Sequence, residues 1–429
     1  MPLIFNKAII NFISGPVSMY ILNPTDSFLK RNPYAPVFIL FGDWHGSPDG
    51  FCFSTGDDNR DFSQYSCKVF SLIFLKLLSD LVEKKEDMKD DKANLINFYI
   101  ESGHGHITPY TPINQEPLLQ LWGWMSKCYN NIRMELTDEQ KQLKTNCDKY
   151  MKNIRWQSGD VRYFYKVQKK MYLWDFLVKF VNKFNTLEKN ETNFTLLLNI
   201  ELGAYNQNHW KIVLENTVIE PEQLCEIYLN DHSILIRKQL EKISDGKFRE
   251  SLLQRFRDYI YYIDTKNDTD TTKILMGNVH SVIIDIIRSE PLTEKRILSV
   301  KKLWGYFQYG ELIKYNSFLL TRLAIMTDLY TIARSYKTMC KSTDESPLIN
   351  VLYFGAYHTE NIASFLTKEY SYGSEEKIRD YDLLYEIKLP TEYTINPSIN
   401  IKRCLTITQD INLKQLIDRL KISRNDMLK

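Results

Sequence analysis

Three short, uninterrupted apolar runs constrain the fold of this chain more than any other feature. They are VFILF at 37–41, LINFYI at 95–100 and VLYF at 351–354, and a fourth apolar run, CLTI, follows at 404–407. Strands covered on both faces read as continuous apolar runs, whereas strands with one wet face alternate. The first three runs therefore predict buried strands of a largely parallel sheet.

The segments between these runs have helical periodicity. In KVFSLIFLKLLSDLV, residues 68–82, Val69, Leu72 and Leu77 fall at helical spacing. This segment joins the first two predicted strands, which suggests a βαβ crossover. From 165 to 345 the pattern is mainly helical, and the polar run at 264–273 predicts an exposed connection there.

Together these patterns predict one α/β domain over 1–429. A mostly parallel central sheet with flanking helices is begun by the N-terminal strands and completed by the C-terminal strands. The 165–345 region is a large helical insertion between them.

Composition and missing motifs exclude several classes of protein. Lys and Arg total 55 against 53 for Asp and Glu, a balance that gives no electrostatic case for binding nucleic acid or a membrane surface. The seven cysteines are scattered without a CxxC pair, which favours reduced thiols in a cytosolic compartment. No signal peptide or membrane-length apolar stretch is evident. The defining residues of P-loop, Rossmann, GxSxG and HExxH enzymes are also missing.

Polar residues follow three of the predicted strands. Asp43 and His45 come directly after the first, Glu101 after the second, and His358 after the strand at 351–354. The carboxyl ends of parallel strands share one edge, where ligands of open α/β sheets bind. His, Glu and Asp are suited to proton transfer and to metal binding. We therefore expect a site at this edge.

Each of these residues, taken alone, also has a structural interpretation that involves no chemistry. Asp43 can cap its loop, and His45 can hydrogen-bond to backbone. His104 and His106, in the ESGHGH segment, can belong to a surface loop. The repeated Gly-x-x-His element, beginning at Gly42 and at Gly355, makes the shared site the preferred interpretation.

A further stretch, RWQSGDVR, carries Arg155, Asp160 and Arg162. Arginine forks suit recognition of carboxylate or phosphate, so these residues are candidates for substrate binding. An internal Asp–Arg salt bridge is an equally good interpretation. In MTDLYTIAR, Asp328 and Arg334 are expected to form a structural network within a buried helix.

The order of the short motifs resembles uncharacterised proteins encoded by nucleocytoplasmic large DNA viruses. The motifs are SGPVS, LFGDWHGS, FYIES, IRWQSGDVR, MTDLYTIAR and YFGAYHTENIASFL, and they span most of the chain except the helical middle, about 171–317. This resemblance implies a viral protein of the host cytoplasm or the virion.

More distantly, the two Gly-x-x-His elements and the strand-end glutamate are similar to a superfamily with divided chemistry. It contains erythromycin esterase-like enzymes, ChaN-like haem-binding proteins and TIKI metalloproteases. In that comparison His45, Glu101 and His358 match the catalytic or metal-binding trio. Asp43 stands where esterase-like members have Glu, a departure that bears on the mechanism.

This resemblance implies a hydrolase in one of two forms. In the metal form, His45, Glu101 and His358 hold Mn, Co or Zn, which lowers the pKa of a bound water toward about 7, and Asp43 orients His45. In the metal-free form, His45 or Glu101 is the general base and His358 stabilises the developing charge.

In either form, Arg155 or Arg162 anchors an anionic part of a small or peptide substrate. The alternative function is a virion or virus-factory structural protein that retains a degenerate enzyme fold. The 27 Tyr and 22 Phe suit the extensive protein contacts that such a role needs.

Overall fold

The structure is a computed structural model, and it divides into two compact units. The sheet unit comprises Met1–Asp160, Gln239–Arg249 and Tyr330–Lys429, and the helical unit comprises Val161–Lys238 and Glu250–Leu329. Each is described by itself. The residues that the structure describes are 3–5, 8–10, 12–14, 16–43, 81–82, 95–103, 153–160, 173–215, 217, 220–230, 234–267, 269–339, 346–370, 378–388, 404–406, 411–427 and 429.

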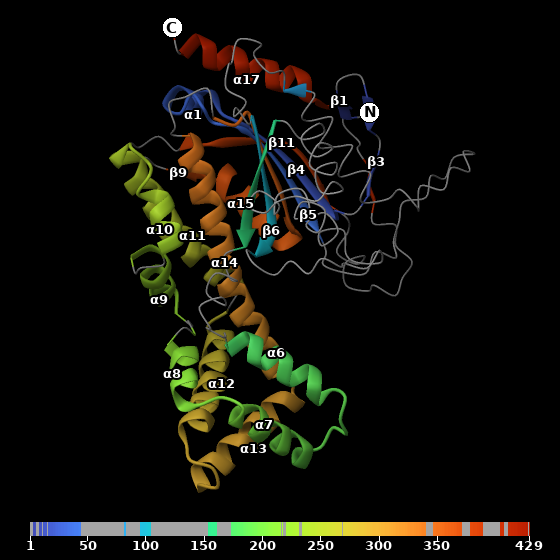
Figure 1. The fold of residues 1–429 in the computed structure, drawn as a ribbon, viewed down its shortest axis with the longest axis vertical. Helices are drawn as coiled ribbons and strands as arrows, with labels where there is room; N and C mark the ends of the chain where they lie inside the picture. The colour runs from blue at the N-terminus through green and yellow to red at the C-terminus, as the bar shows by residue number, and fades with distance from the viewer. Residues whose placement is uncertain are drawn as a thin grey trace, which may run out of the picture. The chain divides into compact units, whose positions relative to one another are not determined.

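The sheet unit is built on a mixed, mostly parallel sheet of six strands in the order β11-β4-β5-β8-β6-β7 (Figure 1). Their bounds are β4 Ser18–Pro24, β5 Val37–Asp43, β6 Ile96–Gly103, β7 Ile154–Asp160, β8 Ile349–Gly355 and β11 Tyr381–Lys388. β5, β8, β6 and β7 are parallel. β4 is antiparallel to β5, and β11 is antiparallel to β4, so β11 runs in the same direction as the four parallel strands. The predicted α/β class with a mostly parallel sheet is confirmed.

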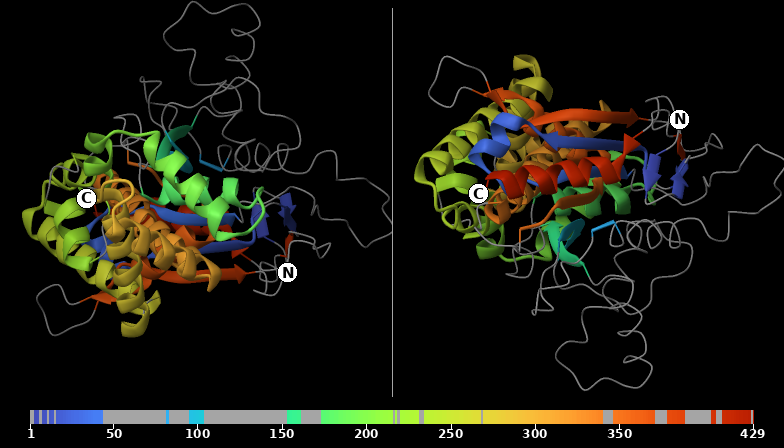
Figure 2. Two further views of the ribbon diagram at one scale, coloured as in Figure 1. Left: turned by 90° about the horizontal axis from the view of Figure 1, so that it is seen from below. Right: turned by 90° about the horizontal axis from the view of Figure 1, so that it is seen from above.

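Strands from the two ends of the sequence lie side by side in this sheet. The blue strands β4 and β5 lie beside the orange C-terminal strands in both views of Figure 2. β5 and β6 are parallel, as a crossover requires, but β8 lies between them. Of the helix predicted at 68–82, only Leu81 and Val82 are among the described residues.

Smaller elements surround the central sheet. They are β1 Leu3–Phe5, β2 Ala8–Ile10, β3 Phe12–Ser14, α1 Asp26–Arg31, α15 Ala356–Thr367, β9 Glu369–Tyr370, β10 Ile378–Arg379, β12 Cys404–Thr406, β13 Ile411–Asn412 and α17 Leu413–Met427. The predicted strand at 404–407 exists as β12, but it pairs with β3 outside the central sheet.

The last helix, α17, fastens the segments that lead into β5 and β8. Arg424 is buried, and its guanidinium donates to the carbonyl oxygens of Tyr34 at 2.8 Å and Pro347 at 2.7 Å. Burial lowers the pKa of Arg424 to about 10, still far above neutral pH. The charge is therefore retained and is stabilised by backbone dipoles.

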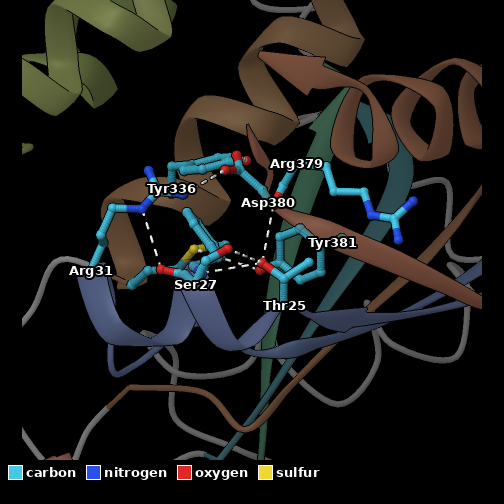
Figure 3. A network of polar contacts seen from close by, with 9 residues as sticks. Thr25, Ser27, Arg31, Tyr336, Arg379, Asp380 and Tyr381 are labelled. Carbon is cyan, nitrogen blue, oxygen red and sulfur yellow. Dashed lines mark hydrogen bonds and ion pairs between the residues drawn. The ribbon is translucent and has the colours of Figure 1, made fainter. Parts of the chain in front are cut away.

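A second polar network joins α1, β11 and the end of α14, Glu311–Met339 (Figure 3). Asp380, which is fully buried, accepts a hydrogen bond of 2.5 Å from the Tyr336 hydroxyl and lies 3.7 Å from Arg31. Thr25, the N-cap of α1, donates its hydroxyl to the Arg379 carbonyl and its N–H to that of Asp380, both at 3.0 Å. Each buried polar group is thereby satisfied, as stability requires.

The predicted helical region between the two groups of strands is confirmed and spans 173–339, and most of it belongs to the helical unit. Its elements are α6 Leu173–Phe184, α7 Glu191–Gly203, α8 Gln207–Glu215, α9 Pro221–Cys225, the π-helical turn η3 Glu226–Asn230, α10 Ile234–Leu240, α11 Gly246–Asn267, α12 Asp270–Arg288, α13 Glu294–Gln308 and α14. Its core is rich in edge-to-face aromatic pairs, such as Phe180 with Phe194 at 5.1 Å.

The predicted exposed connection at 264–273 is wrong for much of its length. α11 continues to Asn267 and α12 begins at Asp270, with Thr269 as its N-cap. Asp264 is 3% exposed and forms a buried ion pair with Arg322, whose guanidinium stacks 3.4 Å from the Phe318 ring centroid. The polar run therefore contains a buried aspartate, Asp264, whose charge is compensated by Arg322 inside the helical unit.

Candidate functional site

A carboxylate and an imidazole meet at the carboxyl ends of the parallel strands. The Oε2 atom of Glu101, on β6, accepts a 2.6 Å hydrogen bond from the backbone N–H of Gly355, the last residue of β8. Its Oε1 atom lies 3.3 Å from Nε2 of His358, in the first turn of α15. The two side chains are 5% and 6% exposed, so water screens their interaction weakly. Two predicted residues that are 257 positions apart are thus in contact (358 minus 101).

The tight junction between β8 and α15 places His358. Gly355 is the N-cap of α15 and lacks a side chain to satisfy the first turn of the helix. Glu101, on the neighbouring strand, accepts instead from the backbone N–H of Gly355 itself, and its negative charge lies at the positive end of the helix dipole. The imidazole is further packed against the Phe354 ring, with centroids 6.2 Å apart.

Gly42 allows the chain to pack closely at the same edge. A Cβ atom at Gly42 would lie 2.1 Å from the Ser18 hydroxyl oxygen and 2.7 Å from the Cα atom of Ala356. Glycine is therefore required by the approach of α15. The next residue, Asp43, is 1% exposed and is paired in register with Gly355. β5 thus ends beside β8, on the opposite side of β8 from β6, which carries Glu101.

The remaining predicted residues are distributed as follows. His45, His104, His106 and Arg162 lie outside the described residues. Asp160 is the last residue of β7 and Arg155 the second, so the two lie at opposite ends of that strand. Their roles in substrate binding stay predictions.

Arg155 belongs to a polar ladder that sequence reasoning missed. Its Nε atom donates to Oδ1 of Asn97 at 2.8 Å, and Nδ2 of Asn97 donates to Oδ1 of Asn350 at 3.1 Å. Both asparagines are fully buried and directly paired in register. A signal was present, because β6 and β8 both begin with Ile-Asn, and a leucine precedes each strand.

The helix MTDLYTIAR does carry buried polar contacts. Asp328 is fully buried and accepts a 2.8 Å hydrogen bond from the Tyr259 hydroxyl within the helical unit. Arg334 instead donates to the Tyr330 hydroxyl, one turn earlier in α14. Asp328 and Arg334 thus each make a polar contact along α14, and a network that joins the two stays a prediction.

The pair formed by Glu101 and His358 fits a divalent metal in its donor chemistry. Two ligands about 2.0–2.1 Å from a tetrahedral ion lie about 3.3–3.4 Å apart, and Glu101 Oε1 and His358 Nε2 are 3.3 Å apart. A direct charge-assisted hydrogen bond is shorter, about 2.7–2.9 Å. Within the described part of the chain no third His, Cys, Asp or Glu completes a metal-binding group.

No protein-family model, curated protein or solved structure matches this chain. Among the helices in the described residues, none is long and apolar enough to cross a membrane. The fold and the site therefore define an α/β protein with a buried Glu–His pair at the carboxyl edge of its sheet.

Proposed function

We propose that this chain is a hydrolase whose active site is the carboxyl edge of the central sheet. The observation that carries the proposal is the contact between Glu101 and His358. Burying a carboxylate beside an imidazole has a cost in solvation, and such arrangements are common where acid–base chemistry is done. The site also lies where open α/β sheets bind their ligands.

In the proposed reaction the imidazole of His358, in place of the His45 or Glu101 expected from the sequence, takes a proton from the attacking water and returns it to the leaving group as the bond breaks. Glu101 orients the ring and stabilises the imidazolium that forms, while the Gly355 N–H fixes the carboxylate. Asp43, the last residue of β5, has the proposed role of orienting His45. The substrate is a small molecule or a peptide with a bond that water can cleave.

Glu101 and His358 are also the residues that would hold a divalent ion such as Mn, Co or Zn, with His45 as the predicted third ligand. Such an ion, when bound, supplies Lewis acidity and makes water a better nucleophile at neutral pH. The N–H of Gly355 would then orient the carboxylate from behind, as outer-shell partners of ligands do.

The test is hydrolysis of a panel of esters, peptides and phosphoesters by the full chain, with metal analysis of the same samples. We expect His358→Ala and Glu101→Gln to lower kcat/KM at least about 100-fold, the range of general acid–base catalysis. His209→Ala is the matched control, because His209 is a half-buried histidine of the helical unit, stacked on Tyr205 at 4.5 Å. Its activity should equal that of the wild type.

The metal form predicts stoichiometric Mn, Co or Zn that is lost in His358→Ala and retained in His209→Ala. Activity without metal that is lost in the same variant supports the metal-free form. If the wild type holds no metal and cleaves nothing in the panel, the hydrolase proposal fails and the structural-protein alternative is favoured.

A further inference from the structure

A layer of polar side chains lies on one face of β6 and β7 and begins at the amino ends of these strands. Asn97 and Tyr99 are two positions apart on β6 and so point to the same face. Asn97 is bonded to Arg155 of β7 and to Asn350 of β8. A continuous apolar strand surface would be the cheaper way to build a core, so this layer requires an explanation.

The helix α14 contributes further polar groups to this layer. A Cβ atom at Gly159 of β7 would lie 3.1 Å from the Thr331 hydroxyl oxygen, so α14 packs closely on this face. One turn on from Thr331 lie Arg334 and Ser335. Burial raises the pKa of the Tyr99 hydroxyl, while the Ser335 side chain and then the charges of Arg334 and Arg155 act against that rise. Both guanidinium groups are therefore within electrostatic range of Tyr99.

The two arginines have no anionic partner within the part of the chain that the structure describes. Arg155 donates to an amide oxygen, and Arg334 donates to the Tyr330 hydroxyl. Half-buried guanidinium groups are normally paired with a carboxylate or a phosphate. Two of them near one hydroxyl repel each other unless an anion lies between them.

Unused hydrogen-bond donors accompany the two charges. Nδ2 of Asn350 and the Thr331 hydroxyl are both fully buried and have no hydrogen-bond partner among the described residues. Buried donors without an acceptor are costly, about 1–3 kcal/mol each. Oε1 of Gln157, which is paired in register with Tyr99, is a buried acceptor that also has no hydrogen-bond partner among the described residues, so the excess in the layer is one of positive charge.

We propose that Arg155 and Arg334 together bind an oxyanion, a phosphate or a carboxylate, beside the hydroxyl of Tyr99. Both arginines are half-buried, so the anion reaches them from the solvent side of the layer. The inference does not rest on the proposed hydrolysis. If both hold, the bound group is the anionic part of the substrate, because Tyr99 precedes Glu101 by two residues on β6.

The test is a titration of the full chain with inorganic phosphate and, separately, with acetate. Thermal unfolding and calorimetry are followed at constant ionic strength set by chloride. We expect saturable binding of at least one anion and a rising unfolding midpoint. Arg155→Gln and Arg334→Gln should each weaken the affinity at least about 10-fold, the loss of one charge-assisted contact. The more strongly bound anion identifies the ligand class.

Arg379→Gln is the control, because Arg379 belongs to the same unit but already pairs with Asp382 at 2.7 Å. Its anion affinity should equal that of the wild type. In chloride alone, Arg334→Gln should be no less stable than the wild type, because the substitution removes a charge without an anionic partner. In phosphate or acetate, the wild type should become the more stable of the two. Tyr99→Phe should bind the anion more weakly by up to about 10-fold.

The proposal is overturned if neither anion binds saturably, or if the arginine variants and the control respond alike. A negative result in the hydrolysis panel leaves this titration unaffected, so failure of one proposal is distinguishable from failure of the other.

Discussion

The helical unit contains a histidine, His280, whose protonation should oppose folding. The variant His280→Gln tests this prediction. Nδ1 of His280 lies 2.6 Å from the Tyr315 hydroxyl oxygen, in a largely buried setting on α12. Burial, and then the positive charge of Arg288, lower the pKa of His280 from 6.5 to about 4. The neutral ring is therefore the form that the folded protein holds.

The sign of the effect follows from proton binding. Between pH 6.5 and pH 4 the unfolded chain carries the proton on His280 and the folded protein does not. Stability from this residue is complete above pH 6.5 and is lost as the pH falls toward 4. With these two pKa values, lowering the pH from about 7.5 to about 5 costs about 2 kcal/mol at 1.36 kcal/mol per unit.

The assay is urea unfolding of wild type and His280→Gln at both pH values. A loss of about 2 kcal/mol lowers the wild-type midpoint by about 1 M urea more than that of the variant, for a slope of about 2 kcal/mol per M. Carboxylates titrate in both proteins and cancel in the comparison. Equal pH dependence in the two proteins would show that His280 is protonated in the folded state and would refute the argument.

Three further predictions concern packing and cooperativity. Gly42→Ala places a methyl group against the backbone of Ala356 and should destabilise the protein by about 1–3 kcal/mol in urea unfolding, whereas Gly203→Ala, at a position with open space, should not. Tyr336→Phe removes the donor to the buried Asp380 carboxylate and should cost about 1–3 kcal/mol by the same assay; an unchanged midpoint would contradict the network of Figure 3. The single-domain prediction requires far-UV circular dichroism and tryptophan fluorescence to report one coincident transition, and two separated transitions would count against it.

The strands were predictable from sequence because strands that are buried on both faces consist of short, continuous apolar runs. β5 and β8 contain the predicted runs, β6 contains its run except for Leu95, and each strand continues beyond its run by one to three residues. Their order was not predictable. β8 enters between β5 and β6 from far along the chain, and no local pattern encodes which neighbours a buried strand takes.

The site was predictable to the same degree. The proximity of Glu101 and His358 was predicted because both were expected at the carboxyl ends of parallel strands, which share one edge of the sheet. The role of the Gly355 N–H was not foreseeable, because nearly every residue has a backbone N–H and the residue type does not indicate which one is used. Asn97 and Asn350 are polar letters within apolar runs, and their pairing depends on a register that only the folded sheet reveals.

The most direct measurement of the central claim is a double-mutant cycle on hydrolysis, with Glu101→Gln, His358→Ala and the double variant. If the two residues act as one unit, removing either of them abolishes the contribution of both to kcat/KM. The double variant should therefore be no slower than the slower single variant. If the two losses in kcat/KM multiply instead, Glu101 and His358 act independently and the proposed pair does not exist.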